Sequence, residues 1–189
     1  TKLSATHASA MVAREGVETP CRIEVVDSLS ASIGLGLQVV RAAEMARAGA
    51  SLDDIVEDAC STVQRTQLFG VVDTLEYLHK GGRIGRAATY LGSVLNVKPI
   101  IGVREGIVHP IERVRGRERA LDRICEMVAG FHSIASLAVA HTTTEDEMEQ
   151  LASRLSQFYP GDDILRTRCG ATLGTYLGPG TLCVALIEG

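Results

Sequence analysis

The sequence contains no tryptophan, and aromatic residues make up only 4% of its 189 residues. Apolar residues nevertheless reach 46%, which is enough for one hydrophobic core or two small ones. The interior must therefore consist mainly of Val, Ile, Leu and Ala. Such interiors are typical of packed α/β layers, and they are equally suited to line a slot for an alkyl chain.

Paired cysteine motifs are also missing. The cysteines are scattered and odd in number, and no two of them form a CxxC pair. This pattern indicates neither a disulfide framework nor a zinc site, and it favours a reducing cytoplasm as the location of the protein. The five residues are Cys21, Cys60, Cys125, Cys169 and Cys183.

Long hydrophobic runs and an excess of positive charge are absent as well. No apolar run approaches the ~20 residues that a helix needs to span a bilayer. The formal net charge of −4 argues against a general nucleic-acid or membrane-surface binder. We therefore expect no nucleic-acid partner and no stable membrane insertion.

Motifs that carry catalysis are not found. The sequence has no Walker loop and no GxSxG elbow, and Gly34-Leu35-Gly36 lacks the third glycine of a dinucleotide fingerprint. His141 follows a predicted strand, but no Ser or Cys in the sequence marks it as half of a catalytic dyad. We expect no cofactor, no metal ligands and no catalytic residues.

Residues 1–66 are predicted to form the C-terminal part of a first α/β lobe. Helical periodicity covers 8–16, 34–48 and 52–63, with Ser51 and Asp54 at the start of the last helix, and 22–26 alternates like a strand. Because one strand cannot form a sheet, we expect the sequence to be a fragment whose first lobe has lost its opening parallel strands.

Residues 67–189 are predicted to form a second α/β lobe with a mixed sheet. The expected strands are 68–72, 99–103, 107–111, 137–140 and 181–188. Residues 104–106 are predicted to be a hairpin turn, and 181–188 is apolar on both faces and so is predicted to be central. The expected helices are 75–79, 120–131 and one that begins with a capping box of Thr144 and Glu147.

Two segments offer groups for an anionic ligand. Thr1, Ser4 and Thr6 are hydroxyls at the start of a helix, where unpaired N–H groups favour anions. Arg83 follows Gly81 and Gly82, and its planar guanidinium suits a carboxylate or a phosphate. The alternatives are a simple helix cap at Ser4 and a helix end followed by a surface arginine.

Two further segments are rich in turn residues or charge. Residues 174–180 contain three glycines and a proline, and they predict a sharp turn that brings the Tyr176 hydroxyl to a pocket mouth at a strand end. Residues 113–119 contain four arginines that suit an acidic or phosphorylated partner. Plain turn chemistry and a solvated strand end explain the two segments about as well.

In their order and spacing, several motifs resemble those of the DegV family of bacterial fatty-acid-binding proteins. The resemblance extends over essentially the whole chain, and the run from Leu75 to Ile100 is its most specific part. The matching segments are Ser4-Ala5-Thr6, Val25-Val26-Asp27-Ser28, Ser32-Ile33-Gly34-Leu35-Gly36, Leu75-Glu76-Tyr77-Leu78-His79-Lys80-Gly81-Gly82-Arg83-Ile84, Leu91-Gly92-Ser93-Val94-Leu95-Asn96-Val97-Lys98-Pro99-Ile100, Arg113-Val114-Arg115 and Leu177-Gly178-Pro179-Gly180.

The resemblance implies a two-lobed DegV-like α/β fold that holds a long-chain fatty acid between the lobes and presents it to a fatty-acid kinase. The head of the acid is then held by hydroxyls and by Arg83, and basic side chains face the kinase. The implied carboxylate-binding residues are Thr1, Ser4, Thr6, Arg83 and Tyr176. The implied kinase-facing residues are Arg113 and Arg115, and the expected tail-lining residues are Ile33, Leu91, Leu95 and Ile100.

The sequence departs from the family pattern at two positions. Tyr176 stands where many members have His, so a role that needs an imidazole is lost, although a hydroxyl donor remains. Ala5 replaces the usual Gly of its turn. Two other functions stay open beside the carrier: a lipid-sensing regulatory module that docks a partner through 113–119, and a phosphotransferase that acts on a small acid.

Overall fold

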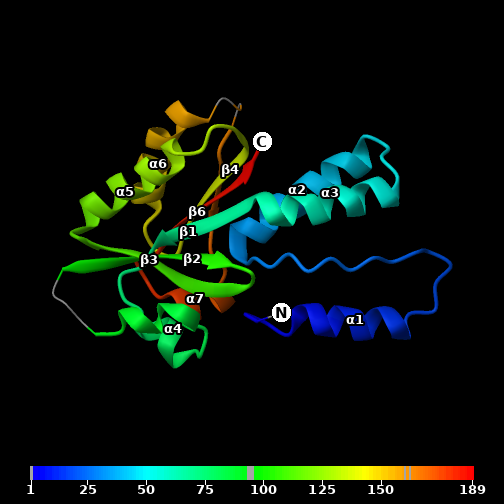
Figure 1. Cartoon of the computed structure of the whole chain (residues 1–189), viewed down its shortest axis with the longest axis horizontal. Helices are drawn as coiled ribbons and strands as arrows, with labels where there is room; N and C mark the ends of the chain where they lie inside the picture. Colours follow the sequence, from blue (N-terminus) through cyan, green and yellow to red (C-terminus); the bar gives the residue numbers. More distant parts are fainter. Residues whose placement is uncertain (1, 93–95, 160, 162) are drawn as a thin grey trace.

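The computed structural model describes residues 2–92, 96–159, 161 and 163–189. Helices and strands alternate along most of this chain (Figure 1). The strands are β1 (Thr66–Val71), β2 (Val97–Arg104), β3 (Ile107–Arg115), β4 (Ile134–His141), β5 (Leu165–Arg168) and β6 (Leu182–Glu188). The helices are α1 (Thr6–Gly16), α2 (Ser32–Arg47), α3 (Leu52–Arg65), α4 (Glu76–Lys80), α5 (Arg117–Ala129), α6 (Glu145–Leu155) and α7 (Ala171–Leu177), with the 3-10 helices η1 (Gly85–Tyr90) and η2 (Ser156–Phe158).

The six strands form one mixed sheet in the order β3-β2-β1-β6-β4-β5. All neighbouring pairs are antiparallel except β4 and β5, which are parallel. Strand β6 lies between β1 and β4 and is buried along nearly its whole length. The predictions of a mixed sheet and of a central last strand are therefore confirmed.

The β2–β3 hairpin turns within two residues. Glu105 and Gly106 both have positive φ angles, 53° and 68°. A two-residue turn with this backbone matches the twist of the flanking strands, and glycine occupies such positions without steric cost. The hairpin predicted around residues 104–106 is confirmed.

The two faces of the sheet are covered by different helices. Helices α5 and α6 pack on one face, where alternate strand residues such as Val71, Val139 and Leu186 form the largest core cluster (Figure 1). The first turns of α2 pack on the other face through Ile33 and Leu37. The part of this second face over β1 and β2 is covered by α4 and α7 instead.

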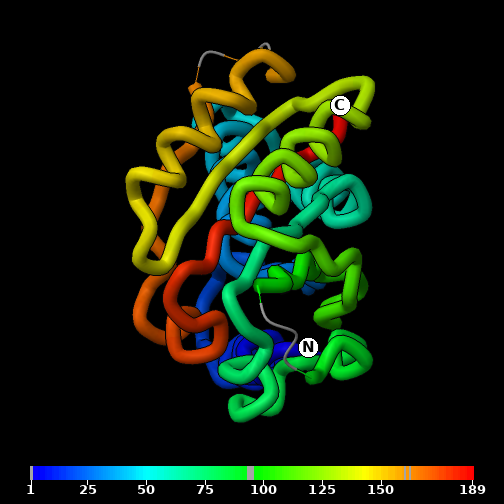
Figure 2. The backbone as a smooth tube through the Cα atoms, turned by 90° about the vertical axis from the view of Figure 1, so that its left-hand side faces the viewer, coloured from blue at the N-terminus to red at the C-terminus, as the bar shows by residue number. Residues whose placement is uncertain are grey.

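Residues 2–65 are helical or extended. Helices α2 and α3 lie side by side, and α1 runs below the extended segment 17–31 (Figure 1). Ser51 and Asp54 form the predicted capping box of α3. The N-terminal residues lie beside segment 72–92, whereas the C terminus lies at the opposite end of the sheet (Figure 2).

The prediction of a strand at 22–26 was wrong. The segment is extended, but it forms no ladder with another strand of the described residues. Alternation of apolar side chains predicts an extended backbone, whereas a strand also needs a hydrogen-bonding neighbour. The parallel sheet expected for residues 1–66 is thus not seen in the described part of the chain, and a domain division at residue 66 stays a prediction.

Two local predictions in the second part of the chain were also wrong. Thr144 precedes α6, but its side chain makes no capping hydrogen bond, and its hydroxyl oxygen is buried without a partner in the described structure. Residues 171–177 form helix α7, so the expected sharp turn begins only at Gly178. Gly178 has φ of 76°, which ends the helix in the left-handed region.

Candidate functional site

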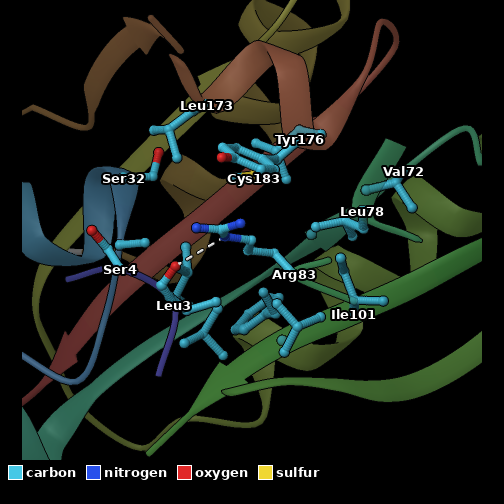
Figure 3. A pocket seen from close by; sticks show the side chains of 18 of the residues that line it. Leu3, Ser4, Ser32, Val72, Leu78, Arg83, Ile101, Leu173, Tyr176 and Cys183 are labelled. Atoms are coloured by element: carbon cyan, nitrogen blue, oxygen red, sulfur yellow. Dashed lines mark hydrogen bonds between the residues drawn. The ribbon is translucent and has the colours of Figure 1, made fainter. Parts of the chain in front are cut away.

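A cavity of about 270 Å³ lies on the face of the sheet that is opposite to α5 and α6. It is bounded by β1, β2 and β6, by α4 and α7, by the start of α2 and by the N-terminal residues (Figure 3). Its lining side chains include Leu3, Ser4, Ser32, Leu68, Val72, Leu78, Arg83, Ile101, Leu173, Tyr176 and Cys183.

The floor of the cavity is apolar because strand residues alternate between the two faces of the sheet. Leu68 and Val72 of the β1 region, Ile101 of β2 and Cys183 of β6 all point to the cavity side. Gly70 lies between the first two, and a Cβ atom there would come within 2.3 Å of the Leu182 carbonyl oxygen. The β1 backbone therefore approaches β6 closely at Gly70, and β1 contributes no side chain to the floor at this position.

The cavity's polar side chains come from separate segments. Ser4 precedes α1, Ser32 begins α2, Arg83 follows α4 and Tyr176 lies in α7. Ser32 has φ of 51°, and its hydroxyl oxygen lies 3.8 Å from the sulfur of Cys169. In Figure 3 the hydroxyls and the guanidinium lie on one side of the cavity, while Val72, Leu78 and Ile101 lie on the other.

Arg83 is held in place by backbone groups and by one ring. Its Nη1–H donates to the Gly81 carbonyl oxygen at 2.9 Å, and its Nε–H donates to the Leu3 carbonyl oxygen at 3.3 Å. Its guanidinium carbon lies 5.0 Å from the centre of the Tyr176 ring, within cation–π range. These contacts use two of the five N–H donors of arginine, and no other residue that the structure describes accepts a hydrogen bond from the remaining three.

The ring of Tyr176 reaches this position because residue 81 has no side chain. A Cβ atom on Gly81 would lie 2.3 Å from the Tyr176 ring. The segment Gly81-Gly82-Arg83 therefore contributes two features to the site. Gly81 leaves room for the Tyr176 ring, and Arg83 stacks against that ring. Neither contact follows from the sequence, since the two segments are far apart along the chain.

The predicted head-group residues are only partly brought together. Ser4, Arg83 and Tyr176 line the cavity, whereas Thr6 does not. The Thr6 hydroxyl lies 2.7 Å from that of Ser4, and the Thr6 N–H donates to the Ser4 hydroxyl oxygen. The Ser4 hydroxyl thereby satisfies the first backbone N–H group of α1. Thr1 lies outside the described residues.

The expected tail-lining residues lie elsewhere. Ile100 is fully buried in the core beneath α5 and α6, because the alternation of β2 places its neighbour Ile101 in the cavity instead. Ile33 is packed between α2 and the sheet and does not line the cavity. Leu91 is 41% exposed and lines a different groove, and Leu95 lies outside the described residues.

Several lining residues were missed. Leu3, Leu78 and Leu173 precede or belong to short helices, where hydrophobic periodicity is too brief to reveal which side faces a cavity. Ser32 lies within one of the motifs that resemble the DegV family, and only this resemblance could have indicated that Ser32 belongs to the site. The position of Cys183 at the cavity could have been predicted only if the pairing register of β1 with β6 had been known.

The arginines expected to face a kinase lie at the end of β3. Arg113 stacks on Tyr90, with its guanidinium carbon 4.5 Å from the ring centre, and its Nη2–H donates to the Thr89 carbonyl oxygen at 3.4 Å. It lines a second groove of about 350 Å³ that also contains Asp73, Glu76 and His79. Arg115 is exposed.

Two further features of the described residues concern metal binding and membrane insertion. No cluster of three or more His, Cys, Asp or Glu side chains in this part of the chain is arranged to hold a metal ion. Among the helices that the structure describes, none combines the length and the apolar character needed to cross a membrane.

Comparison with known proteins identifies the family. The model of the DegV family, described as uncharacterised proteins, matches residues 1–189, and the chain belongs to this family. It is 38% identical over 188 residues to a DegV domain-containing protein of Streptomyces coelicolor, a match that covers 98% of this chain and 66% of that protein. The chain therefore spans slightly less than two thirds of that relative's length.

Solved structures agree with this assignment. A fatty-acid-binding DegV family protein from Thermus thermophilus matches with a TM-score of 0.90 and 32% identity, covering 100% of this chain and 68% of that one. DegV from Bacillus subtilis, a fatty-acid-binding protein, matches with a TM-score of 0.86 and 30% identity over 100% and 68% of the two chains. The predicted DegV-like α/β fold is thereby confirmed.

Proposed function

We propose that this chain forms the binding site of a carrier for a long-chain fatty acid. In this proposal Arg83, Ser4, Ser32 and the Tyr176 hydroxyl hold the carboxylate, and the tail lies on the apolar floor formed by β1, β2 and β6. The fatty-acid binding of the relatives from Thermus and Bacillus supports this choice of ligand.

The observation that carries the proposal is a single arginine, beside a few hydroxyls, at a largely apolar cavity. Among the described residues no carboxylate pairs with Arg83, whose contacts are two carbonyl oxygens and the Tyr176 ring. Arg83 is solvent-exposed where it lines the cavity, and among the described residues no carboxylate competes with an anionic ligand for its guanidinium. A carboxylate matches the fork of free N–H donors, and an alkyl tail matches the floor.

The expected energetics agree with tight binding. Burial of one methylene group contributes about 0.8 kcal/mol, so a tail of ~14 methylenes offers roughly 11 kcal/mol before the costs of association are subtracted. The head group then needs only to be paired, and neutral hydroxyls with one arginine achieve this without a buried excess charge.

We further propose that the protein acts in the cytoplasm without a catalytic site of its own and presents the bound acid to a fatty-acid kinase. Arg115 is exposed, and Arg113 is fixed against Tyr90, so both side chains are available to an acidic or phosphorylated surface of a partner. Thr1 remains the predicted additional hydroxyl for the carboxylate. Thr6, Ile33, Leu91 and Ile100 do not line the cavity, and Leu95 lies outside the described residues.

The first experiment is mass spectrometry of the organic extract from gently purified protein, beside a mock purification. We expect about one equivalent of a long-chain fatty acid. An Arg83→Gln variant should bind a fluorescent fatty acid roughly ten- to a hundredfold more weakly, because a charged hydrogen bond to the head is lost. Arg86→Gln is the matched control, since Arg86 is exposed and lies outside the cavity.

Two results would contradict the proposal. Equal weakening in the Arg83→Gln and Arg86→Gln variants would show that general charge, and not the head-group site, attracts the acid. Turnover of ATP by the protein alone would favour an enzyme over a carrier. The kinase step is tested separately, by comparing acyl phosphate formation with wild-type protein and with an Arg115→Glu variant that still binds the acid.

A further inference from the structure

We propose that a groove at the carboxyl ends of β4 and β5 binds a small molecule that carries a phosphate group. The groove has a volume of about 520 Å³ and is separate from the cavity proposed to hold the fatty acid. It is lined by the residues that follow the two strands, by Arg168 and by one flank of α7. The proposal goes beyond fatty-acid binding, because it concerns residues to which the proposed function gives no role.

The groove lies at the parallel part of the sheet. Strands β4 and β5 are its parallel pair, and α6 lies between them in the chain. Ligands of α/β proteins commonly bind beyond the carboxyl ends of such strands, where the loops that leave the strands come together. Here the two loops are joined, because the Cys169 N–H donates to the His141 carbonyl oxygen at 2.7 Å. The topology therefore places the groove where a small ligand is expected.

Arg168 brings a positive charge to the groove without a counterion. Its side chain is exposed, and its Nε–H donates to the Thr142 carbonyl oxygen at 3.3 Å. No carboxylate of the described residues pairs with it, whereas Arg166 on the same strand pairs with Glu149 at 3.1 Å and with Asp163 at 2.8 Å. The remaining donors of the Arg168 guanidinium form a planar fork that suits a phosphate.

Thr142 and Thr143 add two hydroxyl donors. The Thr142 hydroxyl oxygen accepts a hydrogen bond from the Thr181 N–H at 3.0 Å, and that of Thr143 accepts one from the Gly180 N–H at 2.9 Å. Within the described part of the chain neither hydroxyl donates a hydrogen bond, so the proton of each is available to a ligand. Donors on separate side chains suit the several oxygens of a phosphate better than the two oxygens of a carboxylate.

The wall that α7 gives to the groove is formed by small residues. Gly170 precedes the helix with φ of −64°, and Gly174 lies within it. Neither glycine has a positive φ angle, and a Cβ atom at either position would meet no neighbouring segment within 4 Å. Backbone geometry and packing therefore do not require glycine at these positions, whereas a ligand that lies against the helix backbone does.

The groove and the fatty-acid cavity lie on opposite flanks of α7. Ala171 and Gly174 line the groove, whereas Leu173 and Tyr176 line the cavity. A bound phosphate would thus place negative charge across this helix from the carboxylate of the acid, and this part rests on the proposed function. Because like charges repel, phosphate and fatty acid should each weaken the binding of the other, by the same factor.

The test uses inorganic phosphate as the probe. Protein freed of fatty acid is titrated at constant ionic strength, and backbone amide shifts are followed by NMR. We expect saturable shifts at Thr142, Thr143 and Gly170. Arg168→Gln should weaken phosphate binding about tenfold or more, because a charged fork of donors is lost. Arg166→Gln is the matched control and should change it by about twofold or less, since two carboxylates already engage Arg166.

A second variant fills the groove without removing charge. Gly174→Leu would extend a side chain into open space, so it should abolish the phosphate shifts while the protein stays at least as stable to heat. Gly36→Leu is the matched control, because it makes the same change on α2, where a Cβ atom also meets nothing within 4 Å. This control should bind phosphate like the wild type.

Several results would overturn the proposal. These are no saturable binding of phosphate in the millimolar range, shifts centred on residues 113–119, and equal weakening in the Arg168→Gln and Arg166→Gln variants. Equal binding of acetate would overturn the assignment to phosphate, and unchanged fatty-acid affinity in saturating phosphate would overturn the link between the two sites. Because phosphate is titrated without fatty acid, failure of the groove and failure of the carrier proposal give different results.

Discussion

The helices that cover the six-stranded sheet and the helices of residues 2–65 differ in what they bury. Helix α5 buries five residues and α6 buries four, all against the strands. Helix α1 buries none, α3 buries only Thr62, and α2 is buried only near its start, where it meets the sheet. The described structure therefore has one well-packed core around the sheet, and an N-terminal part that is joined to it by a small contact.

The N-terminal part depends more on ion pairs and on backbone contacts. Arg41 of α2 forms a two-bonded pair with Asp58 of α3, at 2.6 and 2.5 Å. The Gly106 N–H at the hairpin turn donates to the Leu29 carbonyl oxygen at 2.9 Å. Polar contacts of this kind fix geometry, but each contributes far less free energy than the burial of large apolar side chains. We therefore expect residues 2–65 and the sheet with α5 and α6 to differ in hydrogen exchange and in the stability that equivalent substitutions remove.

The largest expected difference is in backbone hydrogen exchange. Amides of β6 should exchange only through global unfolding, whereas amides of α1 should open locally, because α1 has no buried residue to hold it. We expect the rates to differ by about a thousandfold or more, measured by exchange mass spectrometry at the peptide level. Equal protection of α1 and β6 would remove the basis of the comparison.

The next effect is a pair of identical truncations on two helices. Leu151→Ala in α6 should lower the free energy of unfolding by about 3 kcal/mol, because Leu151 is only 1% exposed. Leu35→Ala in α2 should change it by about 0.5 kcal/mol or less, because Leu35 is 41% exposed. Urea denaturation of both variants measures the difference, and similar losses would show that the face of α2 is buried in solution.

Two glycine-to-alanine changes should have opposite signs. Gly81→Ala would place a Cβ atom 2.3 Å from the Tyr176 ring, and should cost about 1–3 kcal/mol and weaken fatty-acid binding. Gly36→Ala lies inside α2 with nothing within 4 Å of its Cβ, and should stabilise the protein by about 0.5–1 kcal/mol. Thermal unfolding reports both signs, and destabilisation by Gly36→Ala would reveal a contact on that side of α2.

The smallest effect concerns the pair between α2 and α3. The Arg41 guanidinium lowers the pKa of the Asp58 carboxyl in the folded state, so the pair stabilises the protein above the unfolded pKa, near pH 4. This contribution, about 1 kcal/mol, is lost as the pH falls through the folded pKa. The stability gap between wild type and Asp58→Asn should therefore stay constant above about pH 5 and narrow as the pH falls below about pH 4. Glu76→Gln, at an exposed pair with Lys80, is the control and should show no measurable gap.

The sequence predicted elements well where the local signal was complete. The Glu105-Gly106 turn needs residues that tolerate positive φ, and the apolar run 181–188 suits a strand buried on both faces. Strand β5 was missed, because Leu165–Arg168 is short and exposed along its length. The strand predicted at 22–26 was wrong for a different reason. Its side chains alternate as in a strand, but no described strand pairs with it.

The site was predictable only in part. A lone arginine after two glycines indicated an anion site, and the structure does place Arg83 at a cavity. The tail-lining residues stay a prediction, and the structure places Ile100 in the core but Ile101 at the cavity. Neighbouring strand positions face opposite sides, and nothing local distinguished the two residues.

The position of β6 at the centre of the sheet affects how the chain is synthesised. Val71 of β1 pairs with Leu182, which is added 111 residues later. At translation rates of about 5–20 residues per second, β6 is synthesised roughly 6–22 seconds after β1. During that interval the hairpin of β2 and β3 can already pair with β1 on its other side, so the nascent sheet presents an apolar open edge. Chaperones that recognise such edges on the ribosome should therefore bind this chain late in its synthesis and release it once β6 has emerged.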